Sequence, residues 1–188
     1  QGDSIYVRTK NDQDMLIDGG PGNAVLEELG EVMPFYDREI NYIVLTHPHS
    51  DHISGLLEVL KRYKVDAVFI TDTVHSTEEY KEFLSIIQEK QVPTKIVRAN
   101  DIINIDTDVN LKILWPIDSY SGKEIDNLNN TSIVGRLTYK NFSLMLTGDA
   151  EKDVLDKIAS NNSNKNLSSQ ILKISHHGSK NAISDNFY

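Results

Sequence analysis

Residues 47–52, which read H-P-H-S-D-H, constrain this chain more than any other stretch. They follow a mostly apolar run at residues 43–46, typical of a strand buried on both faces, and precede a helix-like run that opens at Ser54-Gly55. Four side chains that can bind a metal ion are therefore expected at the mouth of one strand. Neutral imidazole and ionised carboxylate are ligands that a borderline cation such as zinc prefers. These four residues are His47, His49, Asp51 and His52.

The spacing of this cluster suits two cations. His47 and His49 could hold one, while Asp51 and His52, which point the other way around the turn, could hold the second. The alternative interpretation is a solvated polar loop with accidental histidines. The distribution of histidine argues against that alternative, because five of the six histidines fall within residues 47–52 and 175–180. Chance would scatter them, so the sequence favours a shared metal site.

The length and amino-acid composition are those of a globular protein. With 188 residues, of which 39% are hydrophobic and 25% charged, the chain can form a real core, and we expect one domain over residues 1–188. No apolar run approaches the roughly 18 residues of a membrane span. The absence of cysteine excludes disulfides, thiolate metal sites and a cysteine nucleophile. A net charge of −9 argues against broad electrostatic binding of nucleic acid, although cations and local lysines could still neutralise a scissile phosphate.

Apolar periodicity predicts an alternating α/β first half and a β-rich second half. Strands are expected at residues 5–8, 15–17, 43–46, 67–71, 95–97, 111–115, 133–139, 142–147 and 171–174. Helices are expected at residues 24–31, after the histidine cluster, after a capping box at residues 76–79, and at residues 151–159. The helix after the capping box should bury Tyr80, Phe83, Leu84 and Ile87. Polar loops are expected at residues 100–108, 118–130 and 160–169, and the pattern indicates two sheets packed face to face with helices outside.

Two further polar clusters, residues 147–149 and 175–180, also end apolar strands. In α/β sheets, sites form at such strand ends. Asp149 could bridge two cations, because a carboxylate at the end of a buried strand is costly unless it is paired or bound to metal. Alternatively, it could cap a helix that starts at Ala150. Since the other clusters are present, we favour the bridge.

His176 and His177 are adjacent, so on an extended chain they would point to opposite sides. At least one should be a metal ligand, and the other could donate a proton or hold substrate. Both could be ligands only if the strand has ended and the turn at Gly178 redirects the second. Ser179 and Lys180 could contact an anionic oxygen of the substrate, or could simply form an exposed loop.

Three other polar residues have candidate roles beside these clusters. Asp18 lies in a glycine-rich stretch, which reads either as a tight turn or as a carboxylate that supports the metal site. Asn130, in the polar loop before a predicted hairpin, could hold substrate or a ligand, or could serve the turn. Asp51 is both an expected ligand and the natural orienter of an attacking water.

The order of these motifs resembles that of the metallo-β-lactamase superfamily: a strand, H-x-H-x-D-H, later T-G-D, and later S-H-H-G-S. More narrowly, it resembles the hydrolase domain of the ComEC-type DNA-internalisation competence proteins and their free-standing relatives. Choline-phosphoesterase relatives look similar at the last motif. The likeness spans nearly the whole chain and rests on residues 1–5, 16–20, 130–134, 144–151 and 172–180.

This resemblance implies an α/β fold arranged as an αββα four-layer sandwich, with the site between the sheets at one edge. It implies a metal-dependent hydrolase, and for this branch a phosphodiesterase or deoxyribonuclease that acts on DNA or a small phosphodiester. We expect two divalent ions, Zn²⁺ or Mn²⁺, which would activate a hydroxide for attack on phosphorus. The catalytic residues would be Asp51, Asp149 and His177, and the substrate-binding residues Asn130, Ser179 and Lys180. The expected metal ligands are His47, His49, Asp51, His52, Asp149, His176 and His177.

Two departures from the family pattern matter. Lactamases carry another histidine between the first cluster and the aspartate, whereas the only histidine in that interval here is His75, in a loop. The third ligand of the cation held by His47 and His49 would then come from Asp149 or a late histidine. Second, the chain opens without Met and stops at Tyr188, where such domains continue, so we expect a piece truncated at both ends.

The resemblance also bears on partners and rivals. A ComEC-like domain would be fused to a membrane channel domain and lie on the extracytoplasmic side; otherwise a cytoplasmic or secreted location is expected. The sequence does not indicate an oligomeric state. The rival functions are hydrolysis of a carboxylic ester, thioester or β-lactam on the same fold, and a metal-binding module without catalysis.

Overall fold

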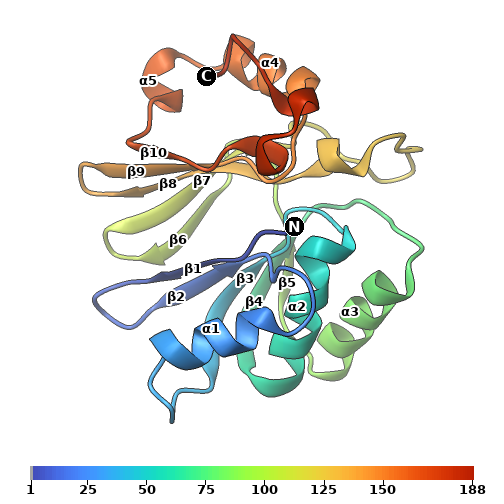
Figure 1. Cartoon of the computed structure of the whole chain (residues 1–188), viewed down its shortest axis with the longest axis vertical. Coiled ribbons are helices and arrows are strands. Elements are labelled where there is room, and N and C mark those ends of the chain that lie inside the picture. Colours follow the sequence, from blue (N-terminus) through green and yellow to red (C-terminus); the bar gives the residue numbers. More distant parts are fainter. Residues whose placement is uncertain (1) are drawn as a thin grey trace.

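Two five-stranded sheets form the centre of the fold (Figure 1). The computed structural model describes residues 2–188, without the side chains of residues 164 and 165, so Gln1 of the predicted opening motif lies outside the described residues. The first sheet contains β1 (Ile5–Arg8), β2 (Asp14–Ile17), β3 (Glu39–Val44), β4 (Lys64–Ile70) and β5 (Thr94–Ile96), in that order. The second contains β10 (Ile171–Leu172), β9 (Phe142–Leu146), β8 (Val134–Tyr139), β7 (Val109–Trp115) and β6 (Ile102–Asp106), in that order.

Strand direction differs between the two sheets. Strands β2 to β5 are parallel, and β1 joins them as an antiparallel edge strand. Strands β6 to β9 are antiparallel, and the short β10 pairs in parallel with β9. The predicted hairpin at Lys140-Asn141 is confirmed, since it joins the antiparallel strands β8 and β9.

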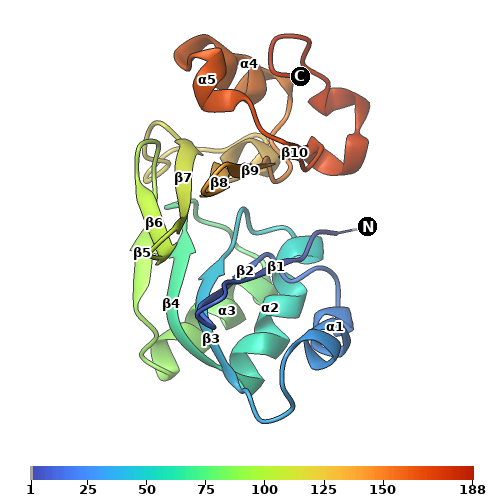
Figure 2. The same cartoon turned by 90° about the vertical axis from the view of Figure 1, so that its left-hand side faces the viewer.

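Helices cover the outer face of each sheet, which gives four layers (Figures 1 and 2). The first sheet is covered by α1 (Ala24–Val32), α2 (Ser50–Arg62) and α3 (Glu78–Glu89), and the second by α4 (Lys152–Asn161) and the short α5 (Asn164–Leu167). Three short 3₁₀ turns complete the chain: η1 (Leu128–Thr131), η2 (Ser175–Gly178) and η3 (Lys180–Ala182). The predicted αββα sandwich is therefore confirmed.

Strand β2 shows why apolar runs place a strand between two layers. Met15 and Ile17 point into the layer between the sheets, whereas Leu16 packs towards α1 and α2. Successive side chains of a strand point to opposite faces, so a strand covered on both sides needs apolar residues throughout. The outer face of the second sheet is covered in the same way, because Val154, Leu155 and Ile158 of α4 pack on it.

The structure corrects two predictions that affect the site. Helix α2 begins at Ser50, inside the histidine motif, and not at Ser54, because the backbone is extended only as far as His49. Asp51 and His52 therefore lie on the first helical turn. The polar loop predicted at residues 100–108 contains strand β6, whose residues 103 and 105 are buried between the sheets.

Other corrections concern the ends and faces of elements. Leu84 was predicted to be buried with its helix face, but it is 39% exposed. The N-cap of α3 is Thr77, whose hydroxyl accepts a hydrogen bond from the Tyr80 amide, so the capping box predicted at residues 76–79 is wrong in register. The predicted loop at residues 160–169 contains α5, and the strand predicted at 171–174 ends at Leu172.

In the part of the chain that the structure covers, residues 2–188, no helix has the length and apolar character needed to cross a membrane.

Candidate metal centre

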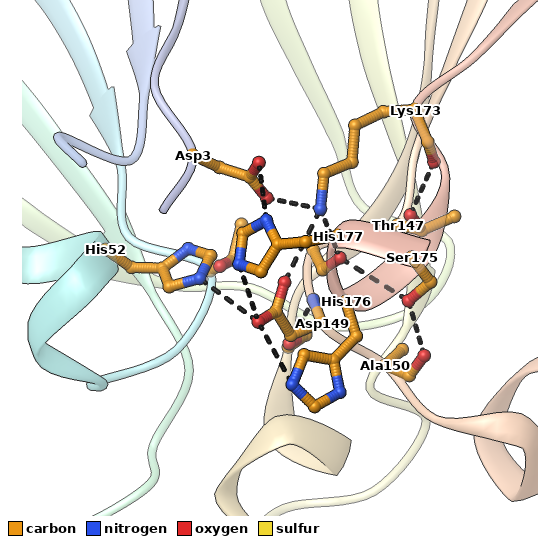
Figure 3. Close-up of polar contacts among 12 residues, drawn as sticks. Asp3, His52, Thr147, Asp149, Ala150, Lys173, Ser175, His176 and His177 are labelled. Carbon is orange, nitrogen blue, oxygen red and sulfur yellow. Dashed lines mark hydrogen bonds and ion pairs between the residues drawn. The ribbon is translucent and has the colours of Figure 1, made fainter. Parts of the chain in front are cut away.

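The predicted metal ligands meet at one edge of the sandwich, beyond the ends of β2, β3 and β9 (Figure 3). His52 enters from α2 on one side, His176 and His177 enter from η2 on the other, and Asp149 lies between them. Residues from distant parts of the sequence are thus brought together. This is the edge where the carboxyl ends of the parallel strands lie, as expected for a site in an α/β fold.

His52 is held by a carboxylate behind it. Its Nδ1 lies 2.7 Å from Oδ2 of Asp18, and both residues are buried. Oδ1 of Asp18 accepts a hydrogen bond from the Thr46 amide at 2.8 Å, and Oδ2 accepts one from the Thr46 hydroxyl at 2.7 Å. Asp18 therefore lies in the supporting position, which was one of the two roles considered for its glycine-rich stretch. A carboxylate on one ring nitrogen fixes the ring and aims the other nitrogen at a metal.

Asp149 is the convergence point of the cluster. Its Oδ2 lies 3.3 Å from Nε2 of His52, 3.4 Å from Nε2 of His177 and 3.9 Å from Nε2 of His176. The alternative role as an N-cap is wrong, because α4 begins only at Lys152 and the cap position is occupied by Glu151.

His176 and His177 lie after the end of β10 and both adopt the left-handed region, with φ of 48° and 52°. The turn therefore points both rings towards Asp149, which was the condition stated for both to be ligands. His177 lies deeper, with its Nε2 3.5 Å from Oδ2 of Asp51. His176 is more exposed, and its Nδ1 lies 3.7 Å from Oε1 of Glu151.

His47 and His49 extend the cluster along the β3–α2 connection. Nε2 of His47 lies 3.1 Å from Nδ1 of His49, and the rings of His47 and His52 have centroids 4.2 Å apart. The Thr46 hydroxyl contacts Nδ1 of His47 at 3.1 Å. All four residues of the H-x-H-x-D-H motif therefore belong to one cluster.

Burial and charge set the protonation of this cluster. Burial lowers the pKa of His47 well below its usual range, and burial likewise lowers the pKa of His49. For His52, burial alone would lower the pKa, but the charges of Asp18 and Asp149 outweigh it and raise the pKa to about 10. For Asp149, burial alone would raise the pKa, but the close contact with His52 and the charges of His52, His47 and Lys173 outweigh it and lower the pKa. A metal ligand must be a neutral imidazole, so binding at His52 would release a proton.

The residues fit a divalent cation. Among the described residues, Nε2 of His52 and Nε2 of His177 are buried without a hydrogen-bond partner, and buried polar groups are rarely left so. One ligand atom each from Asp3, His52, Asp149 and His177 all lie within 4.8 Å of one another. Imidazole and carboxylate together suit Zn²⁺ or Mn²⁺, and a cation at this position would satisfy both free nitrogens.

The predicted substrate-binding residues are placed less centrally. The side-chain oxygen of Asn130 accepts a hydrogen bond from the Glu151 amide at 3.0 Å, which holds the start of α4. The Ser179 hydroxyl accepts from the Asn181 amide at 3.4 Å, and Lys180 is exposed. These contacts are local, and the substrate-binding roles stay predictions.

A groove of about 560 Å³ opens beside His49 and is bordered by His75, Lys123 and residues 124–128. Asp72 joins the two loops that form it. Its carboxylate accepts hydrogen bonds from the Tyr120 amide at 2.9 Å and from Arg98 at 2.8 Å, and from the Ser119 hydroxyl. Burial alone would raise the pKa of Asp72, but these hydrogen bonds outweigh it and lower the pKa to about 2.

Four residues near the cluster were not singled out as site residues from the sequence: Asp3, Asn129, Glu151 and Lys173. Asp3 was noted only as part of the opening motif, and the others lie within matched or polar stretches. Asp3 and Lys173 contact His177 and Asp149, and Asn129 lies 3.5 Å from the His176 ring. The only sequence signal for them was their position beside recognised motifs.

The fold and the cluster together identify the class of protein. The family model described as "Metallo-beta-lactamase superfamily" matches residues 1–157, and the chain belongs to this superfamily. The superfamily is largely hydrolytic and metal-dependent, and its members typically bind two metal ions.

One curated relative matches the chain over its full length. The chain is 28% identical over 204 residues to ComE operon protein 3 of Bacillus subtilis (strain 168), and the match covers 100% of this chain and 25% of that protein. The chain thus spans about a quarter of the length of this curated relative. The predicted resemblance to a ComE-type member of the superfamily is confirmed.

Solved structures agree on the fold. The metallo-beta-lactamase fold protein YhfI from Bacillus subtilis superposes with a TM-score of 0.57 at 14% identity, covering 84% of this chain and 59% of that one. Zn²⁺-bound PqqB from Methylobacterium extorquens superposes with a TM-score of 0.50 at 16% identity, covering 76% of this chain and 50% of that one. At these identities the likeness concerns the fold alone.

Proposed function

We propose that this chain is a phosphodiesterase, able to cleave a small phosphodiester or DNA, whose cluster holds two divalent cations. The observation that carries the proposal is the convergence of two buried, unpartnered imidazole nitrogens, from His52 and His177, on one oxygen of Asp149. The resemblance of the motifs to ComEC-type domains implies the phosphodiester branch of the superfamily, and the likeness to ComE operon protein 3 agrees with that resemblance. The lack of a middle histidine and the acid-rich ligand set also favour it over lactam hydrolysis.

The residues divide into two proposed groups. His47, His49 and Asp149 would hold one cation, and Asp51, His52 and Asp149, with a late histidine, the other. Bound cations would lower the pKa of water towards neutrality and neutralise charge on the phosphoryl oxygens.

Two side chains at the margin of the cluster are placed for proton transfer. Asp51 has a side chain 34% exposed, on the first turn of α2, where it can orient the attacking water and accept its proton. His176 is partly exposed and is backed by Glu151, so it can donate a proton to the leaving oxygen as the bond from phosphorus breaks. Water thus adds to phosphorus, and the leaving group departs as an alcohol.

The groove beside His49 favours a compact substrate. Its border carries one cationic side chain, Lys123, against the carboxylates of Glu124 and Asp126. Tight binding of a long polyanion relies on several cationic contacts along the backbone. A single phosphodiester with a small substituent suits this border better than a long duplex, and DNA is therefore the second substrate to test.

The proposal is tested by activity after chelation and add-back. The metal-free chain is supplied with Zn²⁺ or Mn²⁺ and assayed on bis(p-nitrophenyl) phosphate, on single-stranded and double-stranded DNA, and on a chromogenic β-lactam. We expect metal-dependent turnover of the diester, and its loss in Asp149→Asn purified in parallel, which also controls for contaminating nuclease. Turnover of the lactam without turnover of the diester would refute the proposal. Tight metal binding with no turnover of any substrate would indicate a metal-binding module instead.

A further inference from the structure

A carboxylate also lies behind the ring of His177, at a longer distance than the one behind His52. Oδ1 of Asp3 lies 3.4 Å from Nδ1 of His177, as Oδ2 of Asp18 lies 2.7 Å from Nδ1 of His52. In both pairs, Nε2 is the free nitrogen, and it faces Asp149. Two carboxylate–histidine pairs therefore meet across the Asp149 carboxylate. Such pairs fix the orientation and tautomer of metal-binding histidines.

Lys173 connects the two carboxylates on the His177 side (Figure 3). Its Nζ forms an ion pair with Oδ2 of Asp3, lies 3.4 Å from Oδ1 of Asp149, and donates to the Gly148 carbonyl at 2.7 Å. Lys173 therefore engages one oxygen of each carboxylate. The remaining oxygen of Asp3 faces His177, and the remaining oxygen of Asp149 faces the three histidine nitrogens.

The backbone brings Asp3 to this position by a close approach at Gly2. A Cβ on Gly2 would lie 2.3 Å from the carbonyl oxygen of Asp51 and 2.7 Å from the Pro21 ring. Only glycine fits there, so the opening segment runs against the first turn of α2. The next residue, Asp3, is thereby delivered to the cluster.

His176 is supported at longer distances and lies nearer the surface. Its Nδ1 lies 3.5 Å from Nδ2 of Asn129 and 3.7 Å from Oε1 of Glu151, and its side chain is 27% exposed against 15% for His177. The geometry points to Asp3 and Lys173 as positioning residues that would prepare His177 to hold the cation at Asp51, His52 and Asp149. Asp3 is one of the four residues whose ligand atoms lie within 4.8 Å of one another, but its Oδ1 faces Nδ1 of His177 and its Oδ2 forms an ion pair with Lys173. The assignment therefore makes Asp3 the support of a ligand and not a ligand itself. This inference rests on the metal site of the proposed function, but not on any substrate.

Metal binding without substrate tests this assignment. The stoichiometry of Zn²⁺ is measured by elemental analysis after dialysis, and its affinity by competition with a chromophoric chelator. We expect Asp3→Ala to weaken one of two sites by about 10–100-fold, the usual effect of removing a supporting partner. Asp3→Asn keeps an oxygen that can accept the His177 N–H, so it should restore most of that affinity.

His177→Ala should lose the same site, and His176→Ala should keep both. Asp12→Ala, an exposed aspartate near the same terminus, is the matched control and should leave both sites unchanged.

The variant Lys173→Met distinguishes a positioning role of Lys173 from an effect of its positive charge alone. Removing a cation beside two carboxylates would by itself tighten binding of Zn²⁺. Loss of positioning predicts the reverse, a weakening of the site that Asp3→Ala weakens. The double variant should be little weaker than either single variant, because the two residues act through one contact.

Several results would overturn the inference. An equal loss of Zn²⁺ affinity in Asp3→Asn and Asp3→Ala would indicate that Asp3 is a direct ligand. Unchanged affinity in Asp3→Ala with a lower melting temperature of the metal-free protein would make its role purely structural. Tighter binding in Lys173→Met, or loss of a site in His176→Ala but not His177→Ala, would also contradict it. If the wild-type chain binds no metal, the proposed function fails as well, whereas two intact sites in every Asp3 variant would overturn this inference alone.

Discussion

Replacing Gly55 with alanine should separate α2 from the loop that carries Asp18. A Cβ at Gly55 would lie 1.9 Å from the carbonyl oxygen of Gly19 and 2.6 Å from its carbonyl carbon, whereas real Cβ contacts stay above 3.0 Å. The two segments must therefore part by roughly 1 Å. They are joined by hydrogen bonds from the Gly55 amide to the Gly20 carbonyl at 3.0 Å and from the Gly19 amide to the His52 carbonyl at 2.7 Å.

The expected cost follows from these contacts. Overpacking of a tight interior costs about 1–3 kcal/mol, and each buried polar group left unpaired costs about 1–3 kcal/mol. The higher helix propensity of alanine returns about 1 kcal/mol. With one buried polar group left unpaired, we therefore expect Gly55→Ala to lower the free energy of unfolding by about 1–5 kcal/mol. Because His52 and Asp18 lie on the two separated segments, the affinity for Zn²⁺ should also fall, by about 10–100-fold.

Gly30 provides a matched control in another helix. A Cβ at Gly30 has no described atom within 4 Å, and its backbone is helical. Gly30→Ala should raise the free energy of unfolding by about 0.4–1 kcal/mol and leave metal affinity unchanged. Urea denaturation, followed by circular dichroism, gives the free energy of unfolding of both variants. A Gly55→Ala protein as stable as Gly30→Ala, with wild-type affinity for Zn²⁺, would refute the reasoning.

Three further predictions concern stability. The pKa of Asp72 is lowered from 3.8 to about 2, so its ionised form contributes stability that is present above about pH 4 and lost as the pH falls towards 2. Asp72→Asn should therefore lower the free energy of unfolding by about 2 kcal/mol at pH 7. Urea denaturation at pH 7 and at pH 3 should also show a weaker dependence of stability on pH for this variant. A variant that keeps the wild-type dependence would contradict this. Thr77→Ala removes the cap on the Tyr80 amide and should cost about 1 kcal/mol by the same assay, and no change would mean that water replaces the cap. Saturating Zn²⁺ at about a hundred times Kd should raise the free energy of unfolding by about 2.7 kcal/mol, reversed by chelator, and an unchanged melting temperature would argue against a site in the folded chain.

The sequence was most informative where local pattern decides structure. The apolar triplet in β2 and the hairpin at Lys140-Asn141 have signals within a few residues, and both elements were predicted correctly. Strand β6 was missed because Asn and Asp residues surround its few isoleucines, although the burial of residues 103 and 105 follows an ordinary strand alternation. Leu84 lies at helical spacing from buried neighbours but is 39% exposed, so helical spacing alone overstated the width of the buried face.

The site was predictable in its ligands but not in their supports. His52 and Asp149 belong to motifs whose residue types alone suggest metal binding. Asp3 and Lys173 are ordinary surface residue types, and their role depends on the contact between the segment just before β1 and the segment just after β10. The start of α2 at Ser50 could not be predicted either, because a glycine such as Gly55 is usually read as a helix boundary. In the structure Gly55 lies inside the helix, where its close contact with Gly19 leaves no room for a side chain.

The ion pair between Asp3 and Lys173 closes almost the entire chain into a loop. Contacts between residues so distant in sequence form late in folding, because the entropy of closing the intervening chain must be offset first. During synthesis, Asp3 must therefore wait until Lys173 has left the ribosome. The histidine motif at residues 47–52 emerges far earlier, and it lacks Asp149 and His177 as neighbours until those residues follow. Assembly of the complete centre thus requires segments spread over residues 3–177 to come together.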